Sequence, residues 1–412
     1  MAGLVTLTSA GLYCPSGDFY IDPWRSVANA VLTHGHADHA RAGSKHYIAL
    51  DSGAGILRQR LGQSISLETL ANGQIRKFAD TEVSLHAAGH ILGSAQVRIA
   101  HGDQVTVVTG DFKRTPDPSC APFEVVRCDT LITEATFALP IYRWSDPREV
   151  AAEIYAWWQL EAARGRAVVL CCYSLGKAQR ILAELMQFTD RTVFLHGAMV
   201  PLTQIYRDQG IAMLPTMAVT ADIDTPRHPR NAVDAIPPRH PRESGDPGEV
   251  SASHSGVQGT WVPAFAGMTS DGVAELEASS LLPTNERIPL NEASPGKRSR
   301  KTSKQNFAGE LILAPPSVIG TAWMNRFGAY STGFASGWMA VRGNRRRQSY
   351  DRGFVLSDHA DWDGLIQTIR ESGAKKVYAT HGNSEHLSRY LCELGIDAQA
   401  LKTEFGDQGD SG

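Results

Sequence analysis

The sequence predicts an α/β protein, and three observations lead to this prediction. Short apolar runs dominate residues 1 to about 135, whereas helix and strand patterns alternate from about residue 145 onward. Near the carboxyl end, two further strand patterns run into histidine-bearing loops and then into helices. Because a chain of 412 residues exceeds the roughly 250–300 residues at which single cores stop growing, we expect more than one domain.

The first region is rich in strands. Its β-type runs, each bounded by turn signals, are FYID, NAVLTH, HYIAL, EVSLHAAGH, AQVRIA, QVTVVTGD and TLITEATF. Short β-branched and apolar runs of this kind favour strands, and few helical periods interrupt them. Several runs end abruptly in polar residues, so we expect polar side chains to gather where strands end.

The second region opens with an amphipathic helix. Asp146 and Pro147 supply its start signal, and Gly165 supplies its stop signal. The strand pattern RAVVLCCY, the helix pattern LGKAQRILAELMQF and the strand pattern RTVFLHG follow. This β-α-β order predicts a parallel sheet.

A segment of different composition interrupts the second region at residues 221–305. Ten of the chain's 21 prolines lie between residues 221 and 300, and the tetrapeptide RHPR begins at residues 227 and 239. Without strand or helix periodicity, such a segment buries too little apolar surface to offset its ordering entropy. We therefore predict a disordered, repeat-like insertion whose histidines are not ligands.

The last region returns to globular patterns. GELILAPPSVIG and STGFASGWMAV precede the basic stretch VRGNRRRQSYDRG. FVLSDHADWDGLIQTI and AKKVYATHGNSEHLSRYL then each predict a strand, a histidine-bearing loop and a helix.

Composition excludes several classes of protein. The formal net charge of −3 gives no global electropositive field of the kind that binds nucleic acid unspecifically. The six cysteines form no C-x-x-C pair, which argues against a thiolate zinc site and a disulfide framework. No export signal and no run of about 18 apolar residues is found, so we expect a cytoplasmic protein.

The stretch VLTHGHADHA at residues 31–40 is the strongest functional signal. In an extended segment alternate side chains share a side, so His34 and His36 can point at one metal ion. Asp38 and His39 fall where the chain turns and point elsewhere. The H-x-H-x-D-H pattern therefore supplies two half-sites and predicts two adjacent metals.

Further candidate ligands occupy equivalent places, each after an apolar run. They are His90 with His86 as its rival, Asp111 in VTVVTGD, His359 in FVLSDHAD and His381 in VYATHG. A single histidine after a strand is more often a hydrogen-bonded loop residue than a ligand. Together with the first motif, however, these residues favour a shared metal site.

These residues give the chain a resemblance to the metallo-β-lactamase superfamily, in its β-CASP branch. Outside the insertion the chain is similar to the bacterial ligase-associated DNA exonucleases, a group related to mRNA 3′-end processing factors. Its further marks are GLYCPSGDFYIDPW, GHILGSAQ, CAPFEVVRCDTLITEATFALPIYRW, SLGKAQR, FASGWM and RGFVLSDHADW. They lie on both sides of the insertion, so the resemblance covers most of the chain.

The resemblance implies a fold and a domain order. The fold is a metallo-β-lactamase αββα sandwich with an inserted β-CASP α/β domain. Residues 1–140 would form the first part of the lactamase domain, residues 141–345 the β-CASP domain with its insertion at 221–305, and residues 346–412 the return of the lactamase domain.

The resemblance also implies the roles of the site residues. One metal receives His34, His36 and His90, the other receives Asp38, His39 and His381, and Asp111 bridges the two. Glu134 in TEATF, His359 and His381 match the acidic residue and the two later histidines that complete a β-CASP site. Gly35 between the first histidines is unusual but removes no donor.

The ligand types predict the cofactor and the chemistry. Histidine and aspartate without cysteine suit two Zn²⁺ ions, with Mn²⁺ as the alternative. Two metals can share a hydroxide that attacks phosphorus. We expect Asp38 to take a proton as base, and His359, oriented by Glu134, to protonate the leaving oxygen as general acid.

A phosphodiester substrate needs basic contacts. Arg345, Arg346 and Arg347 lie in the basic stretch before the His359 strand, and Lys177 begins a helix whose amino end can bind phosphate. Ordinary exposed charge is the alternative for Lys177 and for its neighbour Arg180.

Three function classes fit these residues. The first is a DNA exonuclease that works in repair beside an ATP-dependent DNA ligase and a helicase. The second is an RNA-processing nuclease of the β-CASP type, because the metal site does not read the 2′-hydroxyl. The third is a non-catalytic nucleic-acid-binding paralogue, against which the complete ligand set argues.

Overall fold

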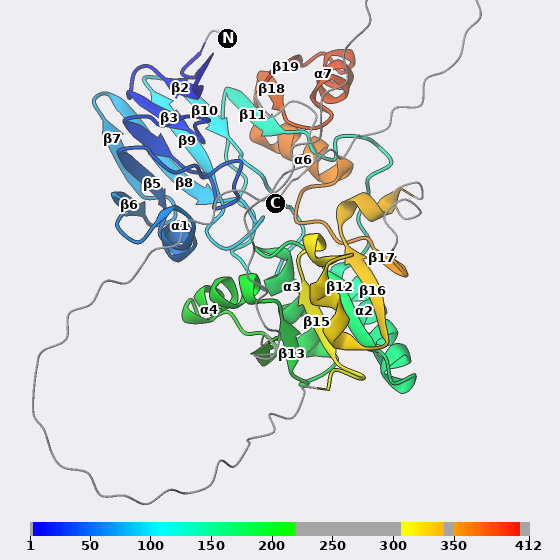
Figure 1. Cartoon of the computed structure of the whole chain (residues 1–412). Helices are drawn as coiled ribbons and strands as arrows, with labels where there is room; N and C mark the ends of the chain where they lie inside the picture. The colour runs from blue at the N-terminus through cyan, green and yellow to red at the C-terminus, as the bar shows by residue number, and fades with distance from the viewer. Residues whose placement is uncertain (1–2, 220–305, 342–349, 404–412) are drawn as a thin grey trace, which may run out of the picture. The chain divides into compact units, whose positions relative to one another are not determined.

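The computed structural model describes residues 3–219, 306–341 and 350–403 of the chain (Figure 1). The predicted insertion at 221–305 lies outside the described residues, so its disorder stays a prediction. Within the described ranges, no helix is both long and apolar enough to cross a membrane.

The first six strands form one mixed sheet. In chain order and in sheet order they are β1 (Thr6–Thr8), β2 (Gly11–Cys14), β3 (Phe19–Ile21), β4 (Asn29–Val31), β5 (His46–Leu50) and β6 (Leu67–Leu70). β3 to β6 run parallel, and the helix α1 (Ala54–Leu61) joins the last two.

Seven strands, drawn from residues 75–134 and 376–400, form a second sheet. Its order is β19 (Asp397–Ala400), β18 (Lys376–Thr380), β11 (Thr130–Glu134), β10 (Gln104–Val108), β9 (Ala95–His101), β8 (Thr81–Ala87) and β7 (Ile75–Phe78). Strands β10, β11, β18 and β19 are parallel, so their carboxyl ends lie at one edge.

These two sheets pack face to face. Ile21, Val31 and Ile48 of the first sheet share one buried core with Val97 and Ile132 of the second. A second core joins the outer face of the second sheet to α6 (Trp362–Ser372) and α7 (Ser384–Glu393), which Figure 1 shows beside β18. The helix α1 covers the outer face of the first sheet through Leu57. The layers are therefore α-β-β-α, and the predicted fold class is confirmed.

A third sheet is entirely parallel. Its order is β14 (Thr216–Ala218), β13 (Val193–Leu195), β15 (Leu311–Ala314), β12 (Ala167–Cys171), β16 (Tyr330–Ala335) and β17 (Arg352–Phe354). One face packs against α2 (Pro147–Ala163), α3 (Lys177–Glu184) and α4 (Val200–Asp208). The other face is covered by the 3₁₀ turns η4 (Pro316–Val318), η5 (Ala322–Phe327) and η6 (Gly337–Ala340).

The predicted β-α-β unit is present with the predicted start signal. Asp146 caps α2 by accepting a hydrogen bond from the Arg148 backbone N–H at 2.8 Å, and Pro147 occupies the first turn. One strand departs from the predicted domain order. We expected residues 346–412 to belong to the returning first domain, but β17 pairs in parallel with β16 of the third sheet. The chain returns to the two packed sheets only after β17.

Helix α2 supplies a test of the third-sheet core. Trp158 is fully buried, and its Nε1 donates to the Gly309 carbonyl at 3.0 Å. We expect Trp158→Ala to lower the free energy of unfolding by about 3–5 kcal/mol, because it leaves a cavity and removes one hydrogen bond to the Gly309 carbonyl. Urea denaturation measures this loss. Leu160→Ala on the same helix is the control, because Leu160 is 49% exposed and should change stability by less than about 0.5 kcal/mol.

Candidate metal centre

The edge of the second sheet gathers the predicted site residues. Val108 of β10 lies opposite Ile132 of β11, so the segments that leave these parallel strands emerge together. Asp111 follows β10, Glu134 is the last residue of β11, and His381 directly follows β18. The carboxyl ends of adjacent parallel strands thereby bring together residues that are far apart in the sequence.

The H-x-H-x-D-H motif leaves the carboxyl end of β4 in the facing sheet. Gly35 lies so close to α1 that an added Cβ would stand 2.5 Å from Cγ2 of Ile56. A larger residue would therefore push the motif away from the helix. The absence of a side chain at this unusual position lets His34 and His36 turn inward.

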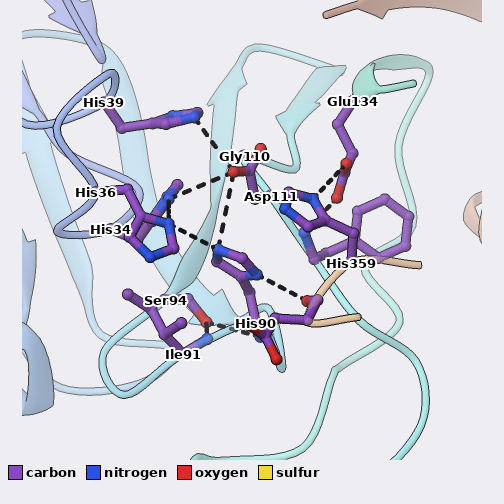
Figure 2. Close-up of polar contacts among 12 residues, drawn as sticks. His34, His36, His39, His90, Ile91, Ser94, Gly110, Asp111, Glu134 and His359 are labelled. Carbon is purple, nitrogen blue, oxygen red and sulfur yellow. Dashed lines mark hydrogen bonds and ion pairs between the residues drawn. The ribbon is translucent and has the colours of Figure 1, made fainter. Parts of the chain in front are cut away.

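Three histidines and one carboxylate form a tight, fully buried group (Figure 2). Nδ1 of His36 lies 3.1 Å from Nε2 of His34 and 3.1 Å from Nε2 of His90. Asp111 Oδ2 lies 3.5 Å from His34 Nε2 and 3.8 Å from His90 Nε2. Tetrahedral zinc with bonds of about 2.0–2.1 Å places its donor atoms roughly 3.3 Å apart, which these separations approach.

Hydrogen bonds fix the outer nitrogens of two of these rings. His36 Nε2 lies 3.3 Å from the Leu175 carbonyl, and His90 Nδ1 lies 2.7 Å from the Asp358 carbonyl. A carbonyl oxygen only accepts, so each of these nitrogens carries a proton. In the neutral form of both rings, His36 Nδ1 and His90 Nε2 carry lone pairs that face each other, an arrangement that suits a cation between them.

The third ring is fixed in the same way. Thr33 Oγ1 donates to Asp22 Oδ2 at 2.5 Å and therefore accepts from His34 Nδ1 at 3.0 Å. Nε2 of His34 is then the third lone pair directed into the group. The loop that bears His90 is held by Ser94, whose Oγ accepts from the His90 backbone N–H at 3.0 Å.

A second group of donors lies on the other side of Asp111. His39 Nε2 is buried, makes no hydrogen bond with any described residue, and lies 3.4 Å from Asp111 Oδ2 and 3.6 Å from Asp38 Oδ2. Its other nitrogen, Nδ1, lies 2.7 Å from Asp22 Oδ2. A buried imidazole nitrogen directed at two carboxylates fits a second cation between them.

His381 completes this second group. Its ring stacks on that of His39 with the centroids 5.6 Å apart, and its Nδ1 lies 3.0 Å from Thr380 Oγ1. His381 has a left-handed backbone with φ of 58°, which an L-residue adopts at an energetic cost. Gly382 follows with φ of 49°, where a Cβ would lie 2.6 Å from the Ala135 carbonyl oxygen. This backbone presents the His381 ring to the site.

Burial sets the protonation of three ligand candidates. It lowers the pKa of His34 well below its ordinary value, lowers the pKa of His90 to about 3, and lowers the pKa of His381. These rings are therefore neutral at pH 7, and neutral imidazole is the form that binds metal.

Neighbouring charges set the protonation of His39 and Asp111. Burial opposes the shift, but Asp111, Asp38 and Asp22 together hold the pKa of His39 well above its ordinary value. Burial also opposes ionisation of Asp111, yet His39 and His359 hold the pKa of that carboxyl well below its usual range. Asp111 is thus a carboxylate between the two histidine groups.

Glu134 and His359 form a buried pair beside Asp111. His359 Nδ1 lies 2.8 Å from Glu134 Oε2, and the other carboxylate oxygen accepts from the Phe112 backbone N–H at 2.8 Å. Burial raises the pKa of Glu134, and the neighbouring His359 opposes this shift. One donor atom each of Asp111, Glu134 and His359 lies close enough to the others to hold a cation, so a ligand role is the alternative for His359.

A small cavity of about 40 Å³ adjoins the second group. It is lined by Asp38, His39, Asp111, Glu134 and His381, together with apolar side chains. A water molecule needs roughly 10–15 Å³ by this measure, so the cavity admits water-sized groups beside the carboxylates.

Several predicted residues lie elsewhere. His86, the rival of His90, lies 3.3 Å from Glu124 Oε2 outside the group. Lys177 is a correction: its side chain is buried and ion-paired with Asp358, so it presents no charge to a substrate. The exposed-charge alternative for Arg180 is wrong for the same reason. Arg345, Arg346 and Arg347 lie outside the described residues and stay predictions.

Two residues that support the site were missed. Asp22 orients His39 and, through Thr33, His34. Asp358 supplies the carbonyl that orients His90. The strand pattern FYID, which ends in Asp22, offered the only signal for the first. Backbone acceptors such as the Asp358 carbonyl leave no signal in a sequence.

Asp22 supplies a second test. We expect Asp22→Asn to weaken binding of one metal by about 10- to 100-fold, because the carboxylate no longer fixes the His39 proton on Nδ1. Titration of the metal-free protein with Zn²⁺ against a chromophoric chelator measures this change. Asp18→Asn is the matched control, because the Asp18 carboxylate accepts only from the exposed Tyr13 hydroxyl among the contacts described. Equal affinity in both variants would contradict the role of Asp22.

Comparisons with known proteins agree with this geometry. No protein-family profile matches the chain. A probable DNA ligase from Opitutus terrae is 25% identical over 395 residues, which are 95% of this chain and 30% of that protein. Integrator complex subunit 11 of Danio rerio is 32% identical over 116 residues, 27% of this chain and 19% of that protein. Transcription termination factor FttA of Pyrococcus abyssi is 30% identical over 150 residues, 34% of this chain and 23% of that protein.

This chain spans less than a third of the length of these relatives. A solved structure of a protein of unknown function from Enterococcus faecalis V583 aligns with 92% of this chain and 80% of its own, with 13% identity and a TM-score of 0.49. Integrator subunit 11 and FttA are β-CASP members of the metallo-β-lactamase superfamily. With the α-β-β-α layers and the histidine cluster, the partial matches to Integrator subunit 11 and FttA support a relationship to the β-CASP metallo-β-lactamases.

Proposed function

We propose that the chain is a two-metal phosphodiesterase that cleaves nucleic acid, and that it acts as a DNA exonuclease in repair. The observation that supports this proposal best is the convergence of the His34, His36 and His90 lone pairs beside Asp111. Such a donor set without cysteine suits zinc in an open catalytic site, with manganese as the alternative.

Each half-site would hold one ion. His34, His36 and His90 would hold the first, Asp38, His39 and His381 the second, and Asp111 both. Two adjacent divalent cations supply an activated water and stabilise the attacking and leaving oxygens of a phosphodiester. Burial keeps His34, His90 and His381 neutral and ready to bind a cation, whereas His39, whose pKa is raised by the neighbouring carboxylates, must first lose a proton.

The proton transfers belong to side chains. Glu134 fixes the proton of His359 Nδ1, so Nε2 is the atom that gives a proton to the leaving oxygen. The Glu134 carboxylate also stabilises the charged form of that imidazole. Asp38, whose side chain is 30% exposed at the site, takes the proton of the attacking water.

The choice of DNA rests on one relative. The protein named a probable DNA ligase matches 95% of this chain, so in that relative a region like this one belongs to a ligase polypeptide. We therefore propose an ATP-dependent DNA ligase, and with it a helicase, as functional partners. RNA is the alternative substrate, because other relatives are named for transcription termination.

The test is a cleavage assay with end-labelled single-stranded DNA, duplex DNA and RNA. We expect DNA to yield a ladder of products that shortens from one end, and we expect a chelator to abolish cleavage and Zn²⁺ or Mn²⁺ to restore it. Cleavage of RNA alone would favour the RNA-processing alternative. Tight binding of nucleic acid without cleavage in the metal-loaded protein would favour the non-catalytic alternative.

A further inference from the structure

Five charged side chains are buried next to the first half-site. They form the α3 ion network, which consists of Lys113, Asp117, Lys177, Arg180 and Asp358. Each of these residues is at most 8% exposed. Charges at the start of a helix normally lie in water, because burial of an unpaired charge is costly. A buried network of this size therefore needs a structural or functional reason.

Ion pairs connect all five residues of the network. Lys177 Nζ lies 3.2 Å from Asp358 Oδ2, and Arg180 Nη1 lies 3.2 Å from Asp358 Oδ1. Arg180 Nε also lies 3.3 Å from Asp117 Oδ2, and Asp117 pairs with Lys113. Asp358 is thus held by two cations at once, and removal of its carboxylate would leave Lys177 buried without its partner.

Two backbone carbonyls beside this network accept hydrogen bonds from candidate metal ligands. The Asp358 carbonyl accepts from His90 Nδ1 at 2.7 Å, and the Leu175 carbonyl, just before α3, accepts from His36 Nε2 at 3.3 Å. Arg180 Nη1 also donates to the Ser357 carbonyl at 2.6 Å. The segment that bears Asp358 is therefore anchored to α3 through both its side chain and its backbone.

From these contacts we infer that Lys177 and Arg180 are positioning residues for the first half-site. Their ion pairs with the Asp358 side chain keep the Asp358 carbonyl in place to accept a hydrogen bond from His90 Nδ1. The ring proton therefore stays on Nδ1, and Nε2 points into the group formed by His34, His36 and Asp111. We expected the start of α3 to contact the substrate, but its charged side chains instead hold the segment that orients a metal ligand. This inference rests on the metal site of the proposed function and adds the residues that set its affinity.

A double-mutant cycle tests the inference. Lys177→Gln removes one of the two cations that hold the Asp358 side chain, and Asp358→Asn leaves Lys177 without its partner, so we expect each to weaken Zn²⁺ binding at the His90 half-site by about 10- to 100-fold. The double variant removes both charges, and we expect it to recover at least tenfold of that loss. Arg180→Lys should lose less affinity than Arg180→Gln, because it keeps a cation.

Two readouts separate positioning from simple stability. Zn²⁺ affinity comes from competition with a chromophoric chelator, and the ¹⁵N shifts of the His90 ring report which nitrogen holds the proton in the metal-free protein. We expect the Nδ1–H form in the unaltered chain and a mixture of both forms in Lys177→Gln. Lys376→Gln is the matched control, because Lys376 pairs with Asp397 at 3.3 Å on a partly exposed sheet edge.

The outcomes distinguish this inference from the proposed function. Unchanged affinity and an unchanged His90 proton in folded Lys177→Gln or Asp358→Asn would overturn the positioning role. If Lys177→Gln does not fold, Arg180→Lys and the double variant decide in the same way. An unaltered chain that binds Zn²⁺ but cleaves no phosphodiester would instead overturn the nuclease proposal and leave the network intact.

Discussion

Replacing His359 with alanine should lower turnover by about 10²- to 10⁴-fold and leave the metal content at two ions per chain. His359 is fixed through Nδ1 by Glu134 at 2.8 Å, an arrangement suited to a proton donor whose other nitrogen faces the reaction. Steady-state cleavage of end-labelled DNA and elemental analysis of the same preparation measure the two quantities.

The two measurements distinguish a loss of acid catalysis from a loss of bound metal. Asp111, Glu134 and His359 converge closely enough to bind a cation, so a ligand role predicts that metal and activity fall together. That outcome would contradict the assignment of His359 as general acid. His86→Ala is the matched control, because His86 also follows the strand pattern but pairs with Glu124 outside the site.

Replacing Asp111 with asparagine should have the largest effect on metal binding. Its Oδ2 lies within 3.4–3.8 Å of His34, His39 and His90, so one oxygen serves both histidine groups. The change preserves side-chain volume but removes the charge between the groups. We expect fewer than two ions per chain and a loss of activity of about 10³-fold or more, because metal stabilisation of this reaction is worth several kcal/mol.

Asp129→Asn is the control for this change. Asp129 lies before β11 in the same sheet, and its carboxylate accepts from the Val105 backbone N–H at 2.9 Å, away from the histidines. We expect this variant to keep both ions and its activity. Two bound ions in Asp111→Asn would contradict the bridging role of Asp111.

Much of the site could be predicted because metal ligation restricts the sequence. The dense H-x-H-x-D-H motif and a polar residue after each strand follow from donors that must meet at the carboxyl ends of strands. The structure brings Asp111, Glu134, His359 and His90 to one place, as the strand pattern predicts.

The supporting contacts could not be predicted because they depend on tertiary packing. Asp22 reaches His39 only after the first sheet forms, and His90 is oriented by a backbone carbonyl. Lys177 and Arg180 look like phosphate contacts, since a helix start with positive charge normally faces solvent. Their burial follows from Asp358, which lies far along the chain and pairs with both.

The predicted start of the last domain, at residue 346, is wrong by one strand for a similar reason. β17 spans only Arg352–Phe354, and its short pattern does not show which sheet it joins. Its parallel pairing with β16 decides this, and strand pairing depends on the whole sheet. The residues that follow β17 then cross to the site and place His359 beside Glu134.

Elemental analysis of the purified, active protein tests the central claim most directly. The account predicts two divalent ions per chain, both removed together with the activity by a chelator and both restored with it. Active protein that contains no bound metal would contradict the account, because the converging lone pairs of His34, His36 and His90 would then have no cation to bind.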